Sequence, residues 1–152
     1  MPYDFLIKDL TSKSSQKAIG TDKGLAKIGD GIVNFVYSVA KSSYLTENSA
    51  NNKIIRTGKK VNRTILSNAL KNANLKICAK SRADAHDLAD TAEALIAYVW
   101  LSGNLSIDSM IEIILTNFSG DLNIRVEELQ NATLAFTKLL ESIKKYIPQS
   151  KV

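Results

Sequence analysis

Apolar residues recur at spacings of three and four along most of the chain, and no stretch alternates apolar and polar residues convincingly. Spacing of three and four gathers side chains on one face of an α-helix, whereas strands give a period of two. The pattern therefore predicts an all-α fold. We expect helices at about 22–42, 62–75, 87–101, 107–118 and 124–147.

Capping and breaking residues support these boundaries. Short polar side chains begin helices, and glycine or proline ends them. The last helix should bury one apolar face. The boundary residues are Asp22, Asp84, Ser106, Gly103, Gly120 and Pro148. The inward residues of the last helix are Val126, Leu129, Ala132, Phe136, Leu139, Leu140 and Ile143.

The segments between the helices are polar or only briefly apolar. We expect 11–20 to be a loop, and 43–61 to be a loop or a short helix with a loop. Near the N-terminus, a short amphipathic turn or helix should dock on the core. It would do so through Tyr3, Phe5, Leu6 and Leu10.

The helix at 22–42 is apolar on more than one side. Such a helix is buried on more than one side. One side can pack on the domain's own core and the other on a second subunit, so we expect a symmetric homodimer. One stripe consists of Leu25, Ile28, Ile32, Phe35 and Val39, and the other of Ala26, Val33 and Tyr37.

Length and composition fit one soluble domain over 1–152. Hydrophobic residues make up 45% and charged residues 23% of the 152 positions, which is ordinary for a globular protein. The only cysteine, Cys78, excludes an intramolecular disulfide and a cysteine cluster for zinc. No long apolar run or basic-then-apolar leader is present, so we expect a cytoplasmic protein without membrane contact.

Positive charge is concentrated in one part of the chain. Residues 48–83 contain nine Lys or Arg and no Asp or Glu; because the whole chain carries +5, the remainder carries −4. This segregation is typical of a surface that binds a polyanion, although a solvated basic face would look the same. The residues we expect to contact phosphate are Lys53, Arg56, Lys59, Lys60 and Arg63.

Three acidic residues lie in apolar surroundings. Asp90 and Glu93 share one helix face, directly before the apolar run 94–101, and Asp30 lies between Gly29 and Gly31 in another apolar segment. Like charges beside a core are costly unless a cation lies between them. We expect Asp84 and Asp87 to act at the helix N-terminus instead, and we assign no chemistry to His86 or Cys78.

These two acidic segments resemble the ribonuclease III endonuclease domain. The second segment, Asp90-Thr-Ala-Glu-Ala-Leu-Ile96, is similar to the family's second carboxylate motif. The first, Ile28-Gly-Asp-Gly-Ile-Val33, is similar to its signature helix, Leu-Gly-Asp-Ala-Val-Leu in consensus. The resemblance covers about 22–103, and the helices at about 106–147 are compatible with the family.

The resemblance implies a metal-dependent endoribonuclease that cuts double-stranded RNA as a dimer. Mg²⁺ or Mn²⁺ would be held by Asp30, Asp90 and Glu93, which would be the catalytic residues. Carboxylates suit this role because magnesium prefers oxygen ligands and keeps water positions open.

The chain departs from the larger enzymes of the family at three positions. Their two signature glutamates correspond to Lys23 and Ala26, and their phenylalanine to Lys27. In this respect the chain resembles the short Mini-III form, and we expect no appended double-stranded-RNA-binding domain. Two alternatives stay open. One is a catalytically silent RNA-binding or ribosome-associated module; the other is a structural helical dimer in which Asp30 caps a helix or pairs with a lysine.

Overall fold

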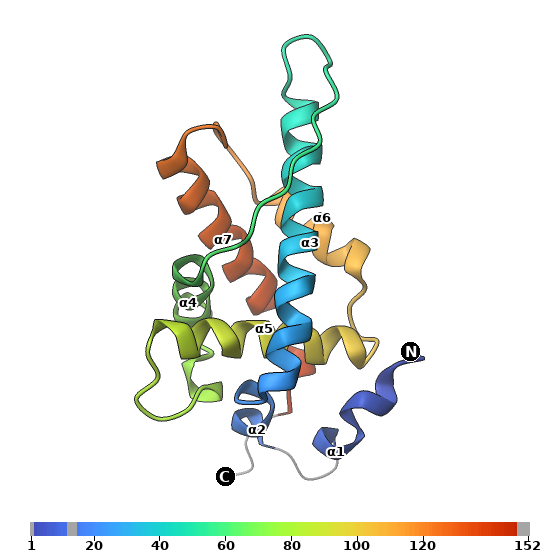
Figure 1. Cartoon of the computed structure of the whole chain (residues 1–152), viewed down its shortest axis with the longest axis vertical. Helices are drawn as coiled ribbons and strands as arrows, with labels where there is room; N and C mark the ends of the chain where they lie inside the picture. The colour runs from blue at the N-terminus through green and yellow to red at the C-terminus, as the bar shows by residue number, and fades with distance from the viewer. Residues whose placement is uncertain (1, 12–14, 149–152) are drawn as a thin grey trace.

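The computed structural model describes residues 2–11 and 15–148, and over these residues it is all-α, with no strand (Figure 1). The predicted fold class is confirmed. The main helices are α3 (Lys23–Glu47), α4 (Arg63–Asn72), α5 (Ala85–Leu101), α6 (Ile107–Thr116) and α7 (Arg125–Ile143). The shorter elements are η1 (Asp4–Ile7), α1 (Lys8–Thr11), α2 (Gln16–Gly20), η2 (Lys76–Cys78) and η3 (Lys144–Tyr146).

The core is organised around α5. This helix is buried along most of its length and packs against α2, α3, α4 and α7. The long α3 crosses it in Figure 1. The ring of Tyr37 on α3 stacks on Phe136 of α7, with their centroids 6.2 Å apart. Because each helix buries its apolar face in the same core, the motif-bearing helices and the C-terminal helices pack as one unit.

Helix caps follow the sequence closely. Asp22 accepts the backbone N–H of Leu25 at the start of α3, and Ser106 caps α6 in the same way. Asp84 and Asp87 form a reciprocal capping box at the start of α5. These two acids therefore act at the helix N-terminus, as expected.

Several boundaries differ from the predictions. Helix α3 continues five residues beyond 42, to Glu47, and Thr46 in this extension exchanges hydrogen bonds with the backbone of Ile55. Residues 16–20, expected to lie in a loop, form α2, where Ser15 accepts the N–H of Ala18; residues 12–14 lie outside the described part of the chain. The final α-helix stops at Ile143. Val126 is 64% exposed, so its predicted inward position was wrong.

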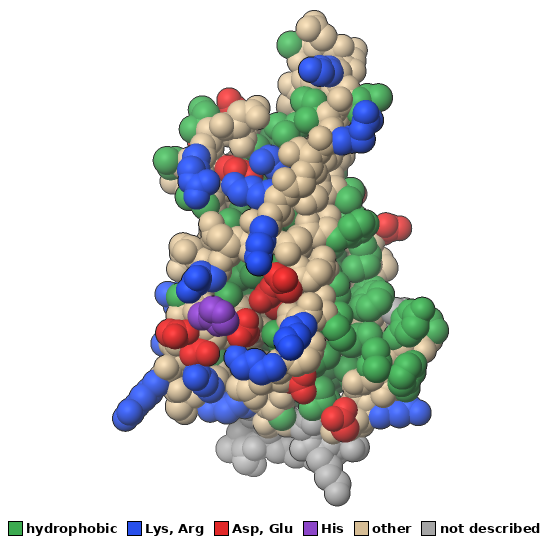
Figure 2. Space-filling view, in the orientation of Figure 1, with side chains coloured by type: hydrophobic (Ala, Val, Ile, Leu, Met, Phe, Trp, Pro, Cys, Tyr) green, Lys and Arg blue, Asp and Glu red, His purple; other side chains and the backbone are tan. Residues whose placement is uncertain are grey.

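One apolar stripe of α3, the one from Leu25 to Val39, is only partly buried and leaves an exposed apolar edge. Leu25 and Ile32 are buried, but Ile28, Phe35 and Val39 are 38%, 57% and 38% exposed. Figure 2 shows hydrophobic side chains gathered along this edge of α3. At the N-terminus, Tyr3 stacks on the partly buried Trp100. Within the described part of the chain, the length and apolarity needed for a membrane span do not occur together in any helix.

Candidate functional site

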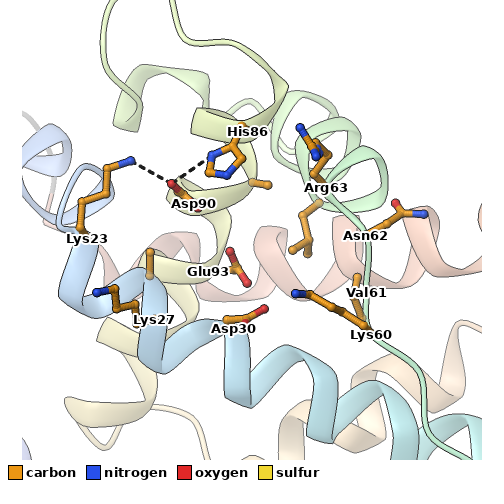
Figure 3. A pocket seen from close by; sticks show the side chains of 13 residues that line it. Lys23, Lys27, Asp30, Lys60, Val61, Asn62, Arg63, His86, Asp90 and Glu93 are labelled. Atoms are coloured by element: carbon orange, nitrogen blue, oxygen red, sulfur yellow. Dashed lines mark hydrogen bonds and ion pairs between the residues drawn. The ribbon is translucent and has the colours of Figure 1, made fainter.

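Asp30 and Glu93 come together where α3 crosses α5. A Cβ atom at Gly29 would overlap the carbonyl oxygen of Glu93, so the two helix backbones are in direct contact there. This contact places the next residue of α3, Asp30, beside the Glu93 side chain. Figure 3 shows the two carboxyl groups pointing toward each other. A glycine before the acid therefore brings the two carboxylates together.

Glu93 is held in an environment that disfavours its charge. Only 7% of the residue is exposed. Burial raises the pKa of Glu93 to about 8, with further contributions from the negative charges of Asp30 and Asp90; Lys60 opposes them. In the absence of a cation, Glu93 therefore keeps a proton at neutral pH. Two facing carboxyl groups that cannot both be charged without a positive partner fit a divalent cation, which prefers oxygen ligands.

Asp90 faces a different way. Its Oδ2 lies 2.8 Å from Nζ of Lys23 and 3.5 Å from Nδ1 of His86, as Figure 3 shows. Among residues 2–11 and 15–148, no three His, Cys, Asp or Glu side chains are gathered closely enough to hold a metal ion. The structure brings together Asp30 and Glu93 but not all three expected acids, because Asp90 is paired with Lys23.

The ion pair between Lys23 and Asp90 is exposed, so another cation could replace Lys23 at Asp90. The Lys23 side chain is 68% exposed, and exposed ion pairs are weak, about 0–1 kcal/mol. Asp90 still lines the same open pocket, of about 670 Å³, as Asp30 and Glu93. A cation in this pocket would compete with the Lys23 ammonium for one carboxylate.

The five expected phosphate contacts lie in three different places. Lys60 and Arg63 line the pocket with the carboxylates. Lys53 and Arg56 are exposed on the segment between α3 and α4. Lys59 points inward, and its Nζ lies 2.6 Å from Oε1 of Glu128. A phosphate would therefore have to compete with a buried carboxylate for Lys59.

Glu128 is the centre of a buried polar cluster that the sequence reasoning missed. Its carboxylate accepts bonds from Tyr37 Oη at 2.6 Å, Lys41 Nζ at 2.8 Å and Lys59 Nζ at 2.6 Å. Burial alone would raise the pKa of Glu128, but these donors outweigh it and lower the pKa to about 2. One signal was available. Glu128 precedes the buried Ala132 by four residues and therefore lies on the inward face of α7.

The Glu128 cluster predicts how stability depends on pH. Because the pKa of Glu128 is lowered from 4.5 to about 2 in the folded state, its stabilising effect is present above about pH 4.5 and is lost as pH falls toward 2. Glu128→Gln should lower the unfolding free energy at pH 7 by about 3 kcal/mol, since breaking a buried ion pair costs roughly 3–5 kcal/mol.

Urea unfolding between pH 7 and pH 2.5 measures this effect. The difference in unfolding free energy between wild type and Glu128→Gln should become smaller as pH falls. The matched control is Glu141→Gln on the same helix, because Glu141 is an exposed partner of Lys138; it should change little. A difference in unfolding free energy that stays constant with pH would show that the charge of Glu128 does not contribute to stability.

Residues 23–149 match the family model described as Ribonuclease III, so the match covers well over half of the chain and both acidic motifs. No curated protein matched the chain.

Proposed function

Because the chain belongs to the ribonuclease III family, we propose that it is a divalent-metal-dependent endoribonuclease that hydrolyses phosphodiester bonds in double-stranded RNA. The family is one of ribonuclease-type enzymes that generally depend on divalent metal. The observation that supports the proposal most strongly is the Asp30–Glu93 pair, two facing carboxyl groups with the pKa of Glu93 raised to about 8.

The residues of the pocket have separable roles in this proposal. Asp30 and Glu93 would hold the metal, and Asp90 would join them when Lys23 releases it. Bound Mg²⁺ or Mn²⁺ supplies an activated water and stabilises negative charge on the reacting oxygens. Glu93 would hold the metal as the deprotonated carboxylate. Lys60 and Arg63, on the rim of the same pocket, attract the phosphates that flank the scissile bond.

A specific observation favours the alternative of a silent RNA-binding module. Ala26, where the larger enzymes have a glutamate, lines the pocket, and the nearby Lys23 supplies a positive charge beside Asp90. The ammonium of Lys23 in this position would remove part of the need for a metal. In that case the protein would bind duplex RNA through its basic residues without cutting it.

The two functions are separated by one assay. Purified protein is incubated with long duplex RNA, with Mg²⁺ or with a chelator, and single-stranded RNA of the same sequence serves as the substrate control. The proposed enzyme shortens the duplex only with Mg²⁺. Binding without shortening, at any Mg²⁺ or Mn²⁺ concentration, would support the silent module.

We also propose that two copies associate through the exposed apolar side of α3. The partly exposed Ile28, Phe35 and Val39 lie on this side, and Figure 2 shows it as a continuous hydrophobic edge. A symmetric pair would cover this surface in both copies. It would also place two carboxylate pockets in one particle, one for each strand of a duplex.

Phe35→Glu should convert the dimer to a monomer. A charge on an apolar interface must be desolvated, which opposes association. Sedimentation at micromolar concentration should give twice the 16.7 kDa chain mass for wild type and the single mass for the variant. Val126→Glu on α7, at a residue 64% exposed, is the matched control and should remain dimeric. A monomeric wild type would rule out the two-pocket arrangement.

A further inference from the structure

A row of polar side chains on α3 holds the segment that leads to α4. The four side chains are spaced four residues apart and therefore lie on one face of the helix. The segment runs back along α3 in Figure 1, from the far end of the helix toward α4. The four side chains are Asn34, Ser38, Ser42 and Thr46.

Each of these side chains accepts one backbone N–H, and the four donors are every second residue of the segment. Two of the hydroxyls also donate back to a carbonyl: Ser42 to Thr57 at 2.9 Å and Thr46 to Ile55 at 3.1 Å. The four accepted bonds are Val61 N–H to Asn34 Oδ1 at 2.7 Å, Lys59 to Ser38 Oγ at 3.1 Å, Thr57 to Ser42 Oγ at 2.9 Å, and Ile55 to Thr46 Oγ1 at 2.9 Å.

The spacing of the row matches the geometry of an extended chain. Four residues of α-helix rise about 6.0 Å, and two residues of an extended chain span about 6.6 Å. Successive acceptors on the helix therefore meet every second amide of the segment, over four acceptors and three steps. The α3 side chains take the place that a neighbouring strand would have in a sheet, and we call this arrangement the α3 ladder.

The α3 ladder sorts the segment into an inner and an outer side. The four bonded residues are buried or half-buried, whereas Ile54, Arg56, Gly58 and Lys60 between them are exposed. The alternation explains why adjacent lysines differ. Lys59 turns inward to Glu128, and Lys60 turns outward to the carboxylate pocket (Figure 3).

The Asn34 end of the ladder is hydrogen-bonded to the carboxylate site. Nδ2 of Asn34 lies 3.2 Å from Oδ1 of Asp30, while Oδ1 of the same Asn34 accepts the N–H of Val61. One amide side chain therefore bridges a carboxylate of the pocket and the segment that carries Lys60. The position of Lys60 relative to Asp30 is fixed by this bridge.

We propose that the α3 ladder is a positioning device that preforms the 54–61 segment as a phosphate-binding edge, with Arg56 and Lys60 as its contact residues and Lys59 as a structural residue. The inference rests on the proposed function, because the ligand is the backbone of duplex RNA. Ordering the segment before binding removes a conformational cost that binding would otherwise carry. Contacts of this kind read backbone and shape rather than sequence.

Amide hydrogen exchange, followed by NMR without RNA, tests the ladder itself. The amides of Ile55, Thr57, Lys59 and Val61 should exchange slowly, and those of Arg56, Gly58 and Lys60 quickly. Thr46→Val and Ser42→Ala should speed exchange at their partner amides. Ser43→Ala is the matched control, because the Ser43 hydroxyl bonds to Glu47 within α3. Uniform exchange along 54–61 would overturn the proposal.

RNA affinity measured against salt, with chelator present to prevent cutting, tests the function of the ladder. Lys60→Gln should weaken binding and flatten the slope of log affinity against log salt by about 0.9, the value for one lost phosphate contact on DNA. Lys59→Gln should leave the slope unchanged and lower the thermal stability. Thr46→Val and Ser42→Ala should weaken binding roughly three- to tenfold at an unchanged slope. These variants make the 54–61 segment less ordered but remove no phosphate contact.

The outcomes separate this inference from the proposed function. If wild type binds duplex RNA but Lys59→Gln flattens the slope as much as Lys60→Gln, the inner and outer assignment is wrong and the function stands. If the ladder variants bind RNA as tightly as wild type, the ladder does not position the segment for binding. If wild type does not bind duplex RNA at all, both the function and the RNA role of the ladder are wrong.

Discussion

Glu93→Gln is expected to reduce Mg²⁺-dependent cleavage of duplex RNA by more than about 100-fold and to make the metal-free protein more stable at pH 8. The loss of activity follows from the loss of a metal-holding oxygen, since changes to groups that only support metal ligands already cost 10–100-fold. Asp30→Asn should lose cleavage to the same extent. Glu112→Gln, an exposed acid on α6, is the matched control and should retain full activity.

The gain in stability follows from the direction of the pKa shift. The folded protein raises the pKa of Glu93 from 4.5 to about 8. Between these values the unfolded chain binds fewer protons than the folded one, so the stability of wild type falls as pH rises from about 4.5 to 8. Gln carries no charge and avoids this loss. The two proteins should therefore have similar stabilities near pH 4 and differ most near pH 8.

Thermal unfolding with and without Mg²⁺ completes this test. Mg²⁺ should stabilise wild type at pH 8 and have little effect on Glu93→Gln, because a ligand stabilises only the state that binds it. Identical pH profiles for the two proteins would show that the folded protein does not raise the pKa of Glu93. Undiminished cleavage by both Asp30→Asn and Glu93→Gln would place the active site elsewhere.

Gly29→Ala is expected to destabilise the protein by about 3 kcal/mol or more, while Gly31→Ala should stabilise it by about 1 kcal/mol. The added methyl group at Gly29 would overlap the backbone of α5 at Glu93, and overpacking typically costs 1–3 kcal/mol even when side chains can move. At Gly31 a Cβ meets nothing within 4 Å. There the only effect on the monomer is the better helix propensity of alanine.

Urea unfolding at several protein concentrations distinguishes folding from association. Gly31 is exposed on α3, so any effect on a dimer would depend on concentration, whereas the loss at Gly29 would not. Equal stabilities for the two variants would contradict the direct contact of α3 and α5. Since this contact brings Asp30 to Glu93, Gly29→Ala should also lower cleavage and metal affinity together.

The sequence was sufficient to predict the helices, because their signals are local. Helix periodicity and caps identify α3, α4, α5, α6 and α7, because a helix depends mainly on neighbours within one or two turns. Gly29 and Gly31 flank Asp30 in the sequence, and the structure shows close backbone packing at Gly29. The family was predicted from two short motifs and is confirmed by the match over 23–149.

What the sequence did not provide depends on partners distant along the chain. The sequence predicted a loop or a short helix with a loop at 43–61, yet α3 continues to Glu47. Thr46 in this extension exchanges hydrogen bonds with Ile55, nine positions away. Lys59 and Lys60 are indistinguishable in the sequence, and only the register of the ladder separates them. The pairing of Lys23 with Asp90 spans 67 positions, so no local pattern could have predicted it.

Single-turnover cleavage of a long RNA duplex by excess protein tests the central claim most directly. Wild type and Asp30→Asn are compared across a Mg²⁺ series, and RNA binding is measured in the same samples. The account predicts that wild type shortens the duplex in proportion to bound Mg²⁺, and that Asp30→Asn binds the duplex without cutting it. An intact duplex with wild type at every Mg²⁺ concentration, despite full binding, would contradict it.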